Sequence, residues 1–382
     1  MNYYDKFDWN TMLLEYPRDK SREFDIPSYH KILCPAEDFP PFLHKYISLP
    51  LLQRLNGIGL LCGTDWTTLY RNRFKYTRLD HSIGVALIIW HFTHSKAQTI
   101  AGLLHDVSTT VFSHVSDFRK GDALTQTITE SPNASILRSD SALLRLLEAD
   151  GLTIEQVEDY HKYPVCDNEI PNLSADRLEY MFPSGAALQG SWSLEEITDV
   201  YGKIAVLTNE EGREELGFTD IRAAEIYVEK FLETGHVLQL NENKLTLQLL
   251  GEITNRAIAL GIITEEDCFT LSEKEVIERF ERFAEKDGTA SAEFTRLFQT
   301  FRSMKEILHT EMPLANAFCV NLKVKMRYIN PLVKVIGGGE KAVEAVEDTP
   351  AKRIFEVSEK SRSLIQDFLS WKDTDWGCVP LV

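Results

Sequence analysis

Residues 77–117 read TRLDHSIGVALIIWHFTHSKAQTIAGLLHDVSTTVFSHVSD, and this stretch decides the fold. It contains His81 and, further on, the pair His105-Asp106, each within an apolar pattern. Burying an imidazole or a carboxylate without a partner costs several kcal/mol. These side chains therefore either pair with one another and with the backbone, or they hold a metal ion.

Two helices are predicted within this stretch. Apolar residues at helical spacing (Ile83, Ala86, Leu87 and Trp90) predict the first helix over 79–93. The segment QTIAGLLHDV predicts a second, central helix over 96–107, which is buried because it is apolar on most sides. Adjacent residues on a helix diverge by about 100°, so His105 and Asp106 can share an ion only in a groove against another helix.

The composition bounds the class of protein. The chain has 382 residues, of which 43% are hydrophobic, enough for a large core and more than one domain. A net charge of −17 argues against sequence-independent binding to nucleic acid. Six scattered cysteines without a CxxC motif fit a reducing compartment. No signal-peptide core or membrane-length apolar run is visible, so we predict a cytoplasmic protein without a membrane partner.

Most of the remaining sequence is helical in pattern. Helices are predicted over 139–149 with Ser139 as the cap, from a Thr153/Gln156 capping box, from Ser174, over 219–234 and 243–260, and after Leu271. The segment LTNEEGREELGF (207–218) is typical of a turn region. From residue 316 the sequence alternates and is rich in Val, which predicts one or two strands ended by three glycines, and a helix follows over 351–369.

Asp176 is the fourth candidate ligand. Together with His81, His105 and Asp106 it makes a mixed nitrogen and oxygen set that suits one divalent metal ion such as Mn, Fe, Ni, Zn or Mg. Each residue alone has an ordinary alternative: a lone histidine in a helix is usually a core or cap residue, and Asp176 is also a first-turn acid favoured by the helix dipole. For the four together these alternatives are much weaker.

Four motifs in order carry a family resemblance. They are Gln53-Arg54-Leu55, Arg78-Leu79-Asp80-His81-Ser82-Ile83-Gly84, His105-Asp106 through Phe112-Ser113-His114 to Asp117, and Asp176-Arg177-Leu178-Glu179-Tyr180. The chain resembles the HD-domain metal-dependent phosphohydrolases and, more narrowly, the branch of the deoxynucleoside triphosphate triphosphohydrolases. Residues 323–331 (KVKMRYINP) also resemble that branch's segment K-x-R-x-x-D-P.

The resemblance implies a fold and a division of the chain. It implies a mainly α protein with an HD-domain helical core that binds metal. With the patterns along the chain it divides the sequence into an N-terminal lead-in (1–30), this core (31–210), a helical extension (211–311) and a small α+β C-terminal subdomain (312–382). Members of the branch commonly form oligomers, so self-association of this chain is an expectation of the resemblance.

The resemblance also implies roles for single residues. His81, His105, Asp106 and Asp176 would ligate the metal. Arg54, Arg78 and Tyr180 would contact substrate, with Arg78 on a phosphate group because its fixed fork of donors suits phosphate. Asp117 or His114 would supply the proton, with Arg78 polarising the phosphoryl group. The ordinary alternatives are a surface ion pair with Asp80 for Arg78 and core packing for Tyr180.

The sequence departs from the branch in the residues near the substrate. The family's Gly-His-Gly is Ser108-Thr109-Thr110 here, and Thr109 cannot exchange a proton near neutral pH. Pro183-Ser184 stands where Arg-Asp is usual, and Leu60 where a Gln is common. Three hypotheses stay open. In the first, the protein is a hydrolase that uses metal-activated water on a phosphate ester, such as a nucleotide or (deoxy)nucleoside triphosphate. In the second, it is a catalytically altered protein that binds a nucleotide or metal in a regulatory role, and in the third the metal site is structural.

Overall fold

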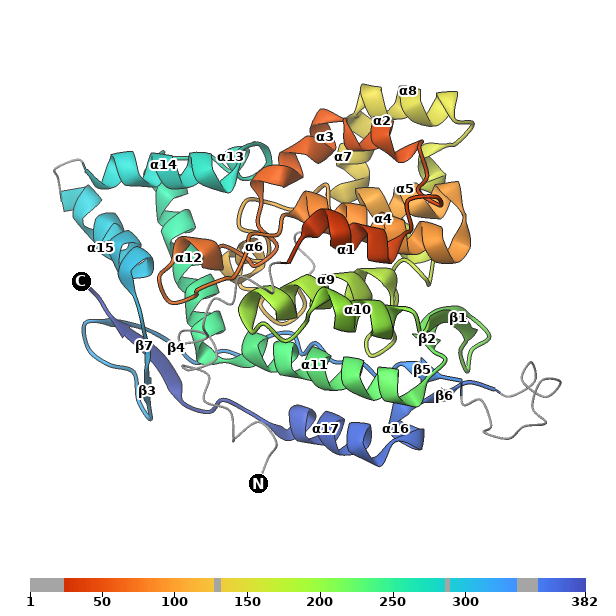
Figure 1. Ribbon diagram of the computed structural model, residues 1–382. Coiled ribbons are helices and arrows are strands. Elements are labelled where there is room, and N and C mark those ends of the chain that lie inside the picture. The colour runs from red at the N-terminus through yellow and green to blue at the C-terminus, as the bar shows by residue number, and fades with distance from the viewer. Residues whose placement is uncertain (1–23, 127–131, 286–288, 335–349) are drawn as a thin grey trace.

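The computed structural model describes residues 24–126, 132–285, 289–334 and 350–382, and most of the predicted lead-in lies outside them. The protein is mainly α-helical, as the sequence predicts, with two small sheets (Figure 1). No helix among the described residues is long and apolar enough to cross a membrane.

The candidate ligands lie in or next to the helices that precede the first strand. These helices are α1 (Ile26–Leu33), α2 (Leu43–Ile47), α3 (Pro50–Gln53), α4 (Arg78–Thr93), α5 (Lys96–Leu104), α6 (Val115–Arg119), α7 (Asn133–Ser139), α8 (Ser141–Ala149), α9 (Ala175–Leu188) and α10 (Leu194–Tyr201). Short 3-10 turns lie at Arg54–Gly57, Thr64–Trp66, Ile154–Gln156 and Tyr160–Lys162.

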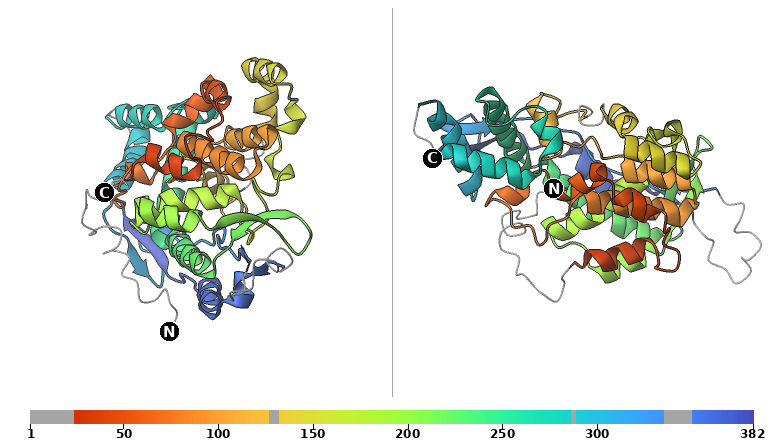
Figure 2. Two further views of the ribbon diagram at one scale, coloured as in Figure 1. Left: turned by 45° about the vertical axis from the view of Figure 1, so that its right-hand side comes forward. Right: turned by 90° about the horizontal axis from the view of Figure 1, so that it is seen from above.

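The later helices follow the first two strands. They are α11 (Ile221–Gln239), α12 (Asn241–Ala259), α13 (Asp267–Thr270), α14 (Glu273–Ala284), α15 (Thr289–Ser303), α16 (Ile354–Val357) and α17 (Glu359–Ser370). Of these, α11 packs against α9 and α10. The turned views of Figure 2 keep α14 and α15 at the end of the molecule away from α7 and α8.

Each sheet joins segments that are distant in sequence. The first sheet has the order β1 (Ile204–Thr208), β2 (Glu214–Phe218), β5 (Leu332–Val333) and β6 (Lys352–Arg353), and β2 pairs with β5 in parallel. The second has the order β3 (Leu308–Thr310), β7 (Trp376–Pro380) and β4 (Ala317–Val320), all antiparallel. Through these pairings the C-terminal segments pack along α11 and α12. The proposed domain boundaries at 210 and 311 remain predictions.

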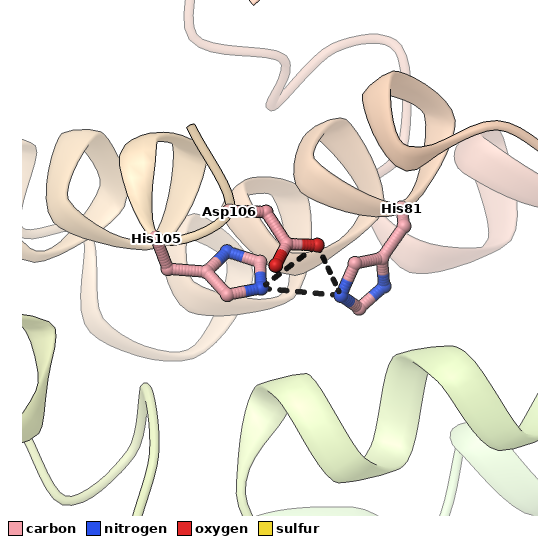
Figure 3. Close-up of side chains that lie close together, drawn as sticks. All are labelled: His81, His105 and Asp106. Atoms are coloured by element: carbon pink, nitrogen blue, oxygen red, sulfur yellow. Dashed lines mark hydrogen bonds and ion pairs between the residues drawn. The ribbon is translucent and has the colours of Figure 1, made fainter. Parts of the chain in front are cut away.

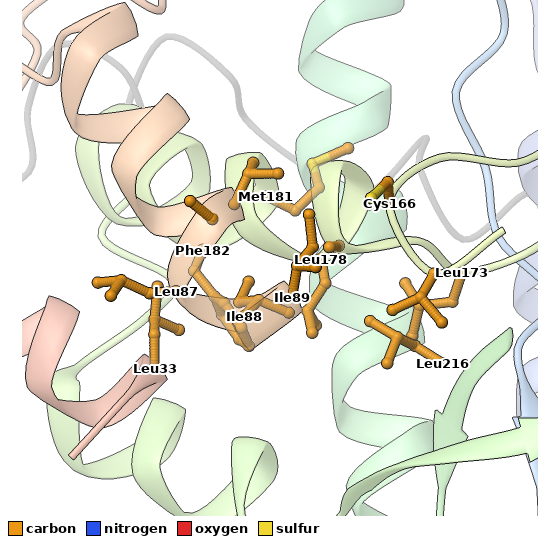
Figure 4. Close-up of a cluster of buried hydrophobic side chains, with 14 of the residues drawn as sticks. Leu33, Leu87, Ile88, Ile89, Cys166, Leu173, Leu178, Met181, Phe182 and Leu216 are labelled. Atoms are coloured by element: carbon orange, nitrogen blue, oxygen red, sulfur yellow. The ribbon is translucent and has the colours of Figure 1, made fainter. Parts of the chain in front are cut away.

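The centre of the fold is the pair α4 and α5, against which α9 packs. Leu87, Ile88 and Ile89 of α4 are buried together with Leu178, Met181 and Phe182 of α9 (Figure 4). Burying a side chain of this size contributes about 1.5 to 3 kcal/mol. A second apolar cluster forms around α12, α14 and α15. The candidate site lies where the stable α4–α5–α9 unit faces α6 and α11.

Several predicted element boundaries need correction. The second helix ends at Leu104, so His105 is its C-cap and Asp106 lies beyond it rather than inside a helix. The cap of the helix predicted over 139–149 is Asp140, whose carboxylate accepts from two amides, while Ser139 ends α7. The Thr153/Gln156 capping box is present but starts only a short 3-10 turn.

The β elements differ more from the prediction. Residues 207–218 contain parts of two paired strands joined by a turn. Residues 215–218 are all buried, and Leu216 and Phe218 pair with Val206 and Ile204 of β1. The Val-rich region gives β4 and the two-residue β5, and the three glycines predicted to end it lie outside the described residues. The helix predicted over 351–369 is interrupted at Ser358, whose side chain caps α17.

Candidate metal centre

Helix ends position the four predicted ligands. His81 lies in the first turn of α4, which starts with a reciprocal capping box between Thr77 and Asp80. Asp176 lies in the first turn of α9, capped by Ser174 as predicted from the sequence. His105 and Asp106 follow the last turn of α5. Three chain segments thus bring their ligands together at helix ends, where the backbone direction is fixed by hydrogen bonds.

The side-chain atoms of the four predicted ligands lie close together. His81 Nε2 lies 3.2 Å from His105 Nε2 and 3.0 Å from Asp176 Oδ1. His105 Nε2 lies 3.5 Å from the same Asp176 oxygen. Asp106 Oδ2 lies 3.8 and 3.7 Å from the Nε2 atoms of His81 and His105 (Figure 3). An ion with bonds of about 2.1 Å separates neighbouring ligand atoms by about 3.0 to 3.4 Å. His81, His105 and Asp106 each offer one atom within 4.8 Å of the others and could hold a metal ion, and Asp176 Oδ1 lies 3.0 and 3.5 Å from the two imidazole nitrogens.

Hydrogen bonds on the other ring nitrogens fix both imidazoles. His81 Nδ1 lies 2.5 Å from Glu179 Oε2, and His105 Nδ1 lies 2.7 Å from the carbonyl oxygen of Gly102. Since a carbonyl can only accept, His105 carries its proton on Nδ1 and directs a lone pair from Nε2 toward His81. This arrangement, an imidazole held by a carboxylate or carbonyl on the side away from the site, is typical of metal-binding histidines.

Glu179 is held by its own partners. It is fully buried, and Tyr76 donates to its Oε1 at 2.5 Å. A Cβ on Gly84 would lie 2.4 Å from Glu179 Oε1, so only glycine at this position of α4 leaves room for the carboxylate. The contact between Glu179 and His81 therefore requires glycine at position 84.

Asp106 is fixed from two sides. Arg78 Nη1 donates to Asp106 Oδ2 at 2.8 Å, and Thr109 Oγ1 donates to Oδ1 at 2.9 Å. Arg78 Nε also donates to Ser113 Oγ at 3.0 Å. The alternative of a surface ion pair between Arg78 and Asp80 is wrong, because Arg78 is buried and Asp80 caps α4.

The turn before α6 has an uncommon backbone. Phe112 and Ser113 both have positive φ, 62° and 55°, although neither is glycine. Ser113 Oγ donates to the carbonyl of Gly59 while it accepts from Arg78. Non-glycine residues in this region cost about 1 to 3 kcal/mol and occur where surrounding contacts require them.

The charges of the centre favour a bound cation. Burial would lower the pKa of His81, but Glu179 and Asp176 outweigh it and raise this pKa to about 10. Burial would likewise raise the pKa of Asp176, but hydrogen bonds from His105 and His81 hold it well below its usual value. The metal-free centre therefore keeps a proton between its carboxylates, in the place that a divalent ion would take.

The site opens into a cavity of about 630 Å³. Its lining includes the four proposed ligands with Arg78, His114 and Tyr180, so the structure brings these predicted residues together. Asp117 is fully buried, is not among the described lining residues, and accepts from His114 Nδ1 at 3.0 Å. Arg54 also lies outside the described lining and donates to the carbonyls of Val107 and Thr109.

Sequence reasoning missed three residues of this site. Glu179 stands three residues after Asp176, one helical turn along α9, and its acidic side chain in an apolar pattern was an available signal. Thr109, which stands where the family has histidine, holds a ligand oxygen. Arg327 lies in the segment that resembles K-x-R-x-x-D-P and reaches the same cavity, which no local pattern indicates.

Comparisons with known proteins found two relatives that match part of the chain. No family model matches the chain. Over 142 residues it is 33% identical to the uncharacterized protein YdhJ of Bacillus subtilis, covering 36% of this chain and 41% of that protein. Over 164 residues it is 26% identical to the metal-dependent phosphohydrolase cns2 of Cordyceps militaris, covering 43% and 46%. The matched stretches span less than half of each relative.

Two solved structures share the fold. A phosphohydrolase from Bacteroides thetaiotaomicron superposes with a TM-score of 0.55 at 15% identity, covering 88% of this chain and 95% of the other. A hypothetical protein from Aquifex aeolicus gives 0.58 at 16% identity, covering 90% and 92%. The similarity to a metal-dependent phosphohydrolase supports the resemblance to HD-type hydrolases. The triphosphohydrolase branch stays a prediction.

Proposed function

We propose that the protein is an HD-type metal-dependent phosphohydrolase that acts on a phosphate ester, with a nucleotide as the preferred class of substrate. The observation that carries the proposal is that ligand atoms of His81, His105 and Asp106 lie within 4.8 Å of one another, with Asp176 Oδ1 3.0 and 3.5 Å from the two imidazole nitrogens, in the wall of a large cavity. A purely structural metal site would not need a cavity of about 630 Å³ beside it.

His81, His105, Asp106 and Asp176 would hold the ion. When bound, a divalent ion supplies a Lewis acid for a phosphoryl oxygen and lowers the pKa of water. Arg78 lines the same cavity and stays charged, because the Asp106 carboxylate outweighs the effect of burial and raises the pKa of Arg78 further. Its guanidinium would bind and orient a phosphate oxygen beside the ligand shell.

His114 and Asp117 would handle the proton. His114 lines the cavity, whereas Asp117 is buried and contacts His114 Nδ1. We therefore assign proton exchange to His114 Nε2 and the orientation of its ring to Asp117. Tyr180, whose ring centroid lies 6.5 Å from that of His81, would pack against the organic part of the substrate. Arg54 would act by holding the backbone at Val107 and Thr109.

A regulatory binding role is the second candidate. It is favoured by Thr109, whose hydroxyl is committed to Asp106 and has no proton to exchange near neutral pH. Such a protein would bind a metal ion and a nucleotide in the same cavity without turnover.

A reconstitution experiment tests the proposal. The full chain is stripped with a chelator, reloaded with Mn, Fe, Ni, Zn or Mg, and assayed against deoxynucleoside triphosphates, nucleoside monophosphates and a generic phosphate ester. We expect metal-dependent phosphate release that a His105→Ala/Asp106→Ala double variant lacks. Stoichiometric metal with nucleotide binding but background turnover would favour the regulatory role. A folded protein that takes up no metal would exclude both.

A further inference from the structure

Arg327 differs from the other arginines in the cavity wall. Arg78, Arg177 and Arg213 also line it, and each forms an ion pair with a carboxylate. Among the described residues, no carboxylate oxygen lies within 4 Å of the Arg327 guanidinium. In a chain with a net charge of −17, a cavity cation that is paired only with neutral groups is available to an anion.

The contacts of Arg327 direct it to the site. Its Nη2 donates to Gln126 Oε1 at 2.6 Å and lies 3.3 Å from His114 Nε2. Its guanidinium carbon lies 5.8 Å from the centre of the Tyr180 ring, which in turn lies beside His81. One aromatic ring therefore separates Arg327 from a proposed metal ligand.

The fold fixes the backbone that carries Arg327. A Cβ on Gly235 of α11 would lie 2.8 Å from the Arg327 carbonyl oxygen, so this glycine allows a close approach of the two segments. Gln239 Nε2 donates to the carbonyl of Lys325 at 2.9 Å, and the Lys325 amide donates to Ala123 at 3.0 Å. These contacts make the position of Arg327 a built feature of the cavity rather than an exposed loop contact.

We propose that Arg327 binds a phosphate oxygen of the substrate, and that its contact with His114 is exchanged for that oxygen when the substrate enters. A guanidinium has five donors and bonds more strongly to an anionic oxygen than to a neutral amide or imidazole. The exchange moves only hydrogen bonds, and no covalent bond forms or breaks. This inference rests on the proposed function for the identity of the anion.

The exchange has a consequence for His114. As a donor to Asp117, the Nδ1 atom of His114 carries the ring proton, so Nε2 accepts from Arg327. While Arg327 occupies Nε2, this atom is closed to the substrate. The charged groups that act on His114 are Asp117 on its own helix, Arg327 and Arg78. Burial lowers the pKa of His114, the hydrogen bond with Asp117 opposes this effect, and the two arginines add to it. An anion on Arg327 would both free Nε2 and favour its protonation.

Phosphate binding provides the first test. Titration calorimetry with inorganic phosphate is performed on the full chain at equal, measured metal content, for the wild type, Arg327→Gln, Arg327→Lys and Arg145→Gln. Arg145 is exposed, and its replacement removes the same charge. We expect phosphate affinity to fall about tenfold or more in Arg327→Gln, less in Arg327→Lys, and not in Arg145→Gln. Equal affinity in Arg327→Gln and the wild type would overturn the proposal.

Histidine NMR provides a readout that a merely structural role of Arg327 would not move. The His114 resonance is identified by its absence in His114→Asn. We expect saturating phosphate to shift this resonance and raise the His114 pKa in the wild type, and to do neither in Arg327→Gln. A His114 resonance that ignores phosphate in the wild type would overturn the exchange even if Arg327→Gln is unstable.

These two tests separate the inference from the proposed function. Neither uses turnover, so a protein that binds phosphate through Arg327 but hydrolyses no ester would retain the inference and lose the hydrolase proposal. A hydrolase whose phosphate affinity and His114 signal ignore Arg327 would give the opposite result.

Discussion

Thr109 Oγ1 donates a 2.9 Å hydrogen bond to Asp106 Oδ1, while Asp106 Oδ2 faces the two imidazoles. Thr109, which stands where the resembled motif has histidine, thus supports a proposed metal ligand instead of exchanging a proton. It does so together with Arg78, which holds Oδ2. The substitution of threonine for histidine is therefore compatible with a functional metal shell.

Thr109→Val tests this support. Valine keeps the shape of threonine but leaves Asp106 Oδ1 without its donor, and changes in groups that orient metal ligands cost about 10- to 100-fold in affinity. We expect a loss near the lower end of that range, because Arg78 still holds Asp106. Metal titration of the stripped protein measures it, and Thr109→Ser serves as the control that keeps the hydroxyl. A valine variant with wild-type affinity would show that Thr109 is dispensable.

Gly84→Ala tests the room that the fold leaves for Glu179. The added Cβ would lie 2.4 Å from Glu179 Oε1 and would displace the carboxylate that orients His81. We expect metal affinity to fall about 10- to 100-fold although no ligand is changed.

Ser82→Ala is the matched control for Gly84→Ala. Ser82 lies on the same helix beside His81, and its buried hydroxyl has no hydrogen-bond partner in the described part of the chain. Alanine at this position should leave metal affinity unchanged. If both variants bind metal like the wild type, the Glu179–His81 contact does not contribute to the site.

Metal binding should release protons. In the metal-free protein the pKa of His81 is raised to about 10, so at neutral pH this imidazole is protonated and must lose its proton to become a ligand. We therefore expect the apparent affinity to rise about tenfold for each pH unit between 7 and 9, as one proton leaves per ion. Calorimetry in buffers of different ionisation enthalpy counts the protons, and a count of zero at pH 7 would contradict the proposed role of His81.

The same pKa predicts how metal-free stability depends on pH. A histidine whose folded pKa lies above its ordinary value stabilises the fold fully below that ordinary value, and this contribution is lost as the pH rises toward 10. The metal-free protein should therefore lose stability between pH 7 and 10. The metal-loaded protein should lose less of it, since its imidazole is neutral throughout. Thermal unfolding of both forms across this range measures the difference.

Asp150 should control acid stability far from the metal. Its carboxylate, at the end of α8, accepts from Lys45 and Tyr46 and pairs with Lys96 at 3.0 Å. Burial would raise the pKa of Asp150, but these three partners lower it to about 2. This contribution is present above the ordinary pKa and is lost as the pH falls toward 2.

Asp150→Asn is therefore expected to cost about 2 kcal/mol at pH 7 and much less near pH 2. Thermal or denaturant unfolding of both proteins at the two pH values measures the change. A penalty that is equal at both would show that charge at Asp150 is not what stabilises the junction of α2, α5 and α8.

Helix caps and apolar spacing in the sequence correctly predicted the helices that carry Asp176 and His81. Ser174 starts α9 as predicted, which places Asp176 in its first turn, and the apolar spacing of 79–93 located the helix that carries His81. The end of α5 could not be predicted, because no glycine or proline follows Leu104 to stop the helix. Tertiary contacts of the 105–114 turn end it instead.

The rest of the site depends on contacts between distant segments. Glu179 acquires its role only because Gly84 of another helix leaves space for it. Arg327 reaches the cavity only because the chain approaches α11 at Gly235. The polar segment 207–218 resembles a turn when it is considered alone. It forms strands because β2 also pairs with β5, more than a hundred residues later. Such pairings cannot be inferred from one sequence without the packed structure.

The order of these segments along the chain also matters during synthesis. All four proposed ligands precede residue 177, whereas Arg327 is added about 150 residues later, which takes roughly 8 to 30 s at ribosomal elongation rates. A nascent chain therefore holds all four proposed ligands well before Arg327 is added. Metal binding by these residues during synthesis would then precede completion of the cavity and the phosphate contact proposed for Arg327.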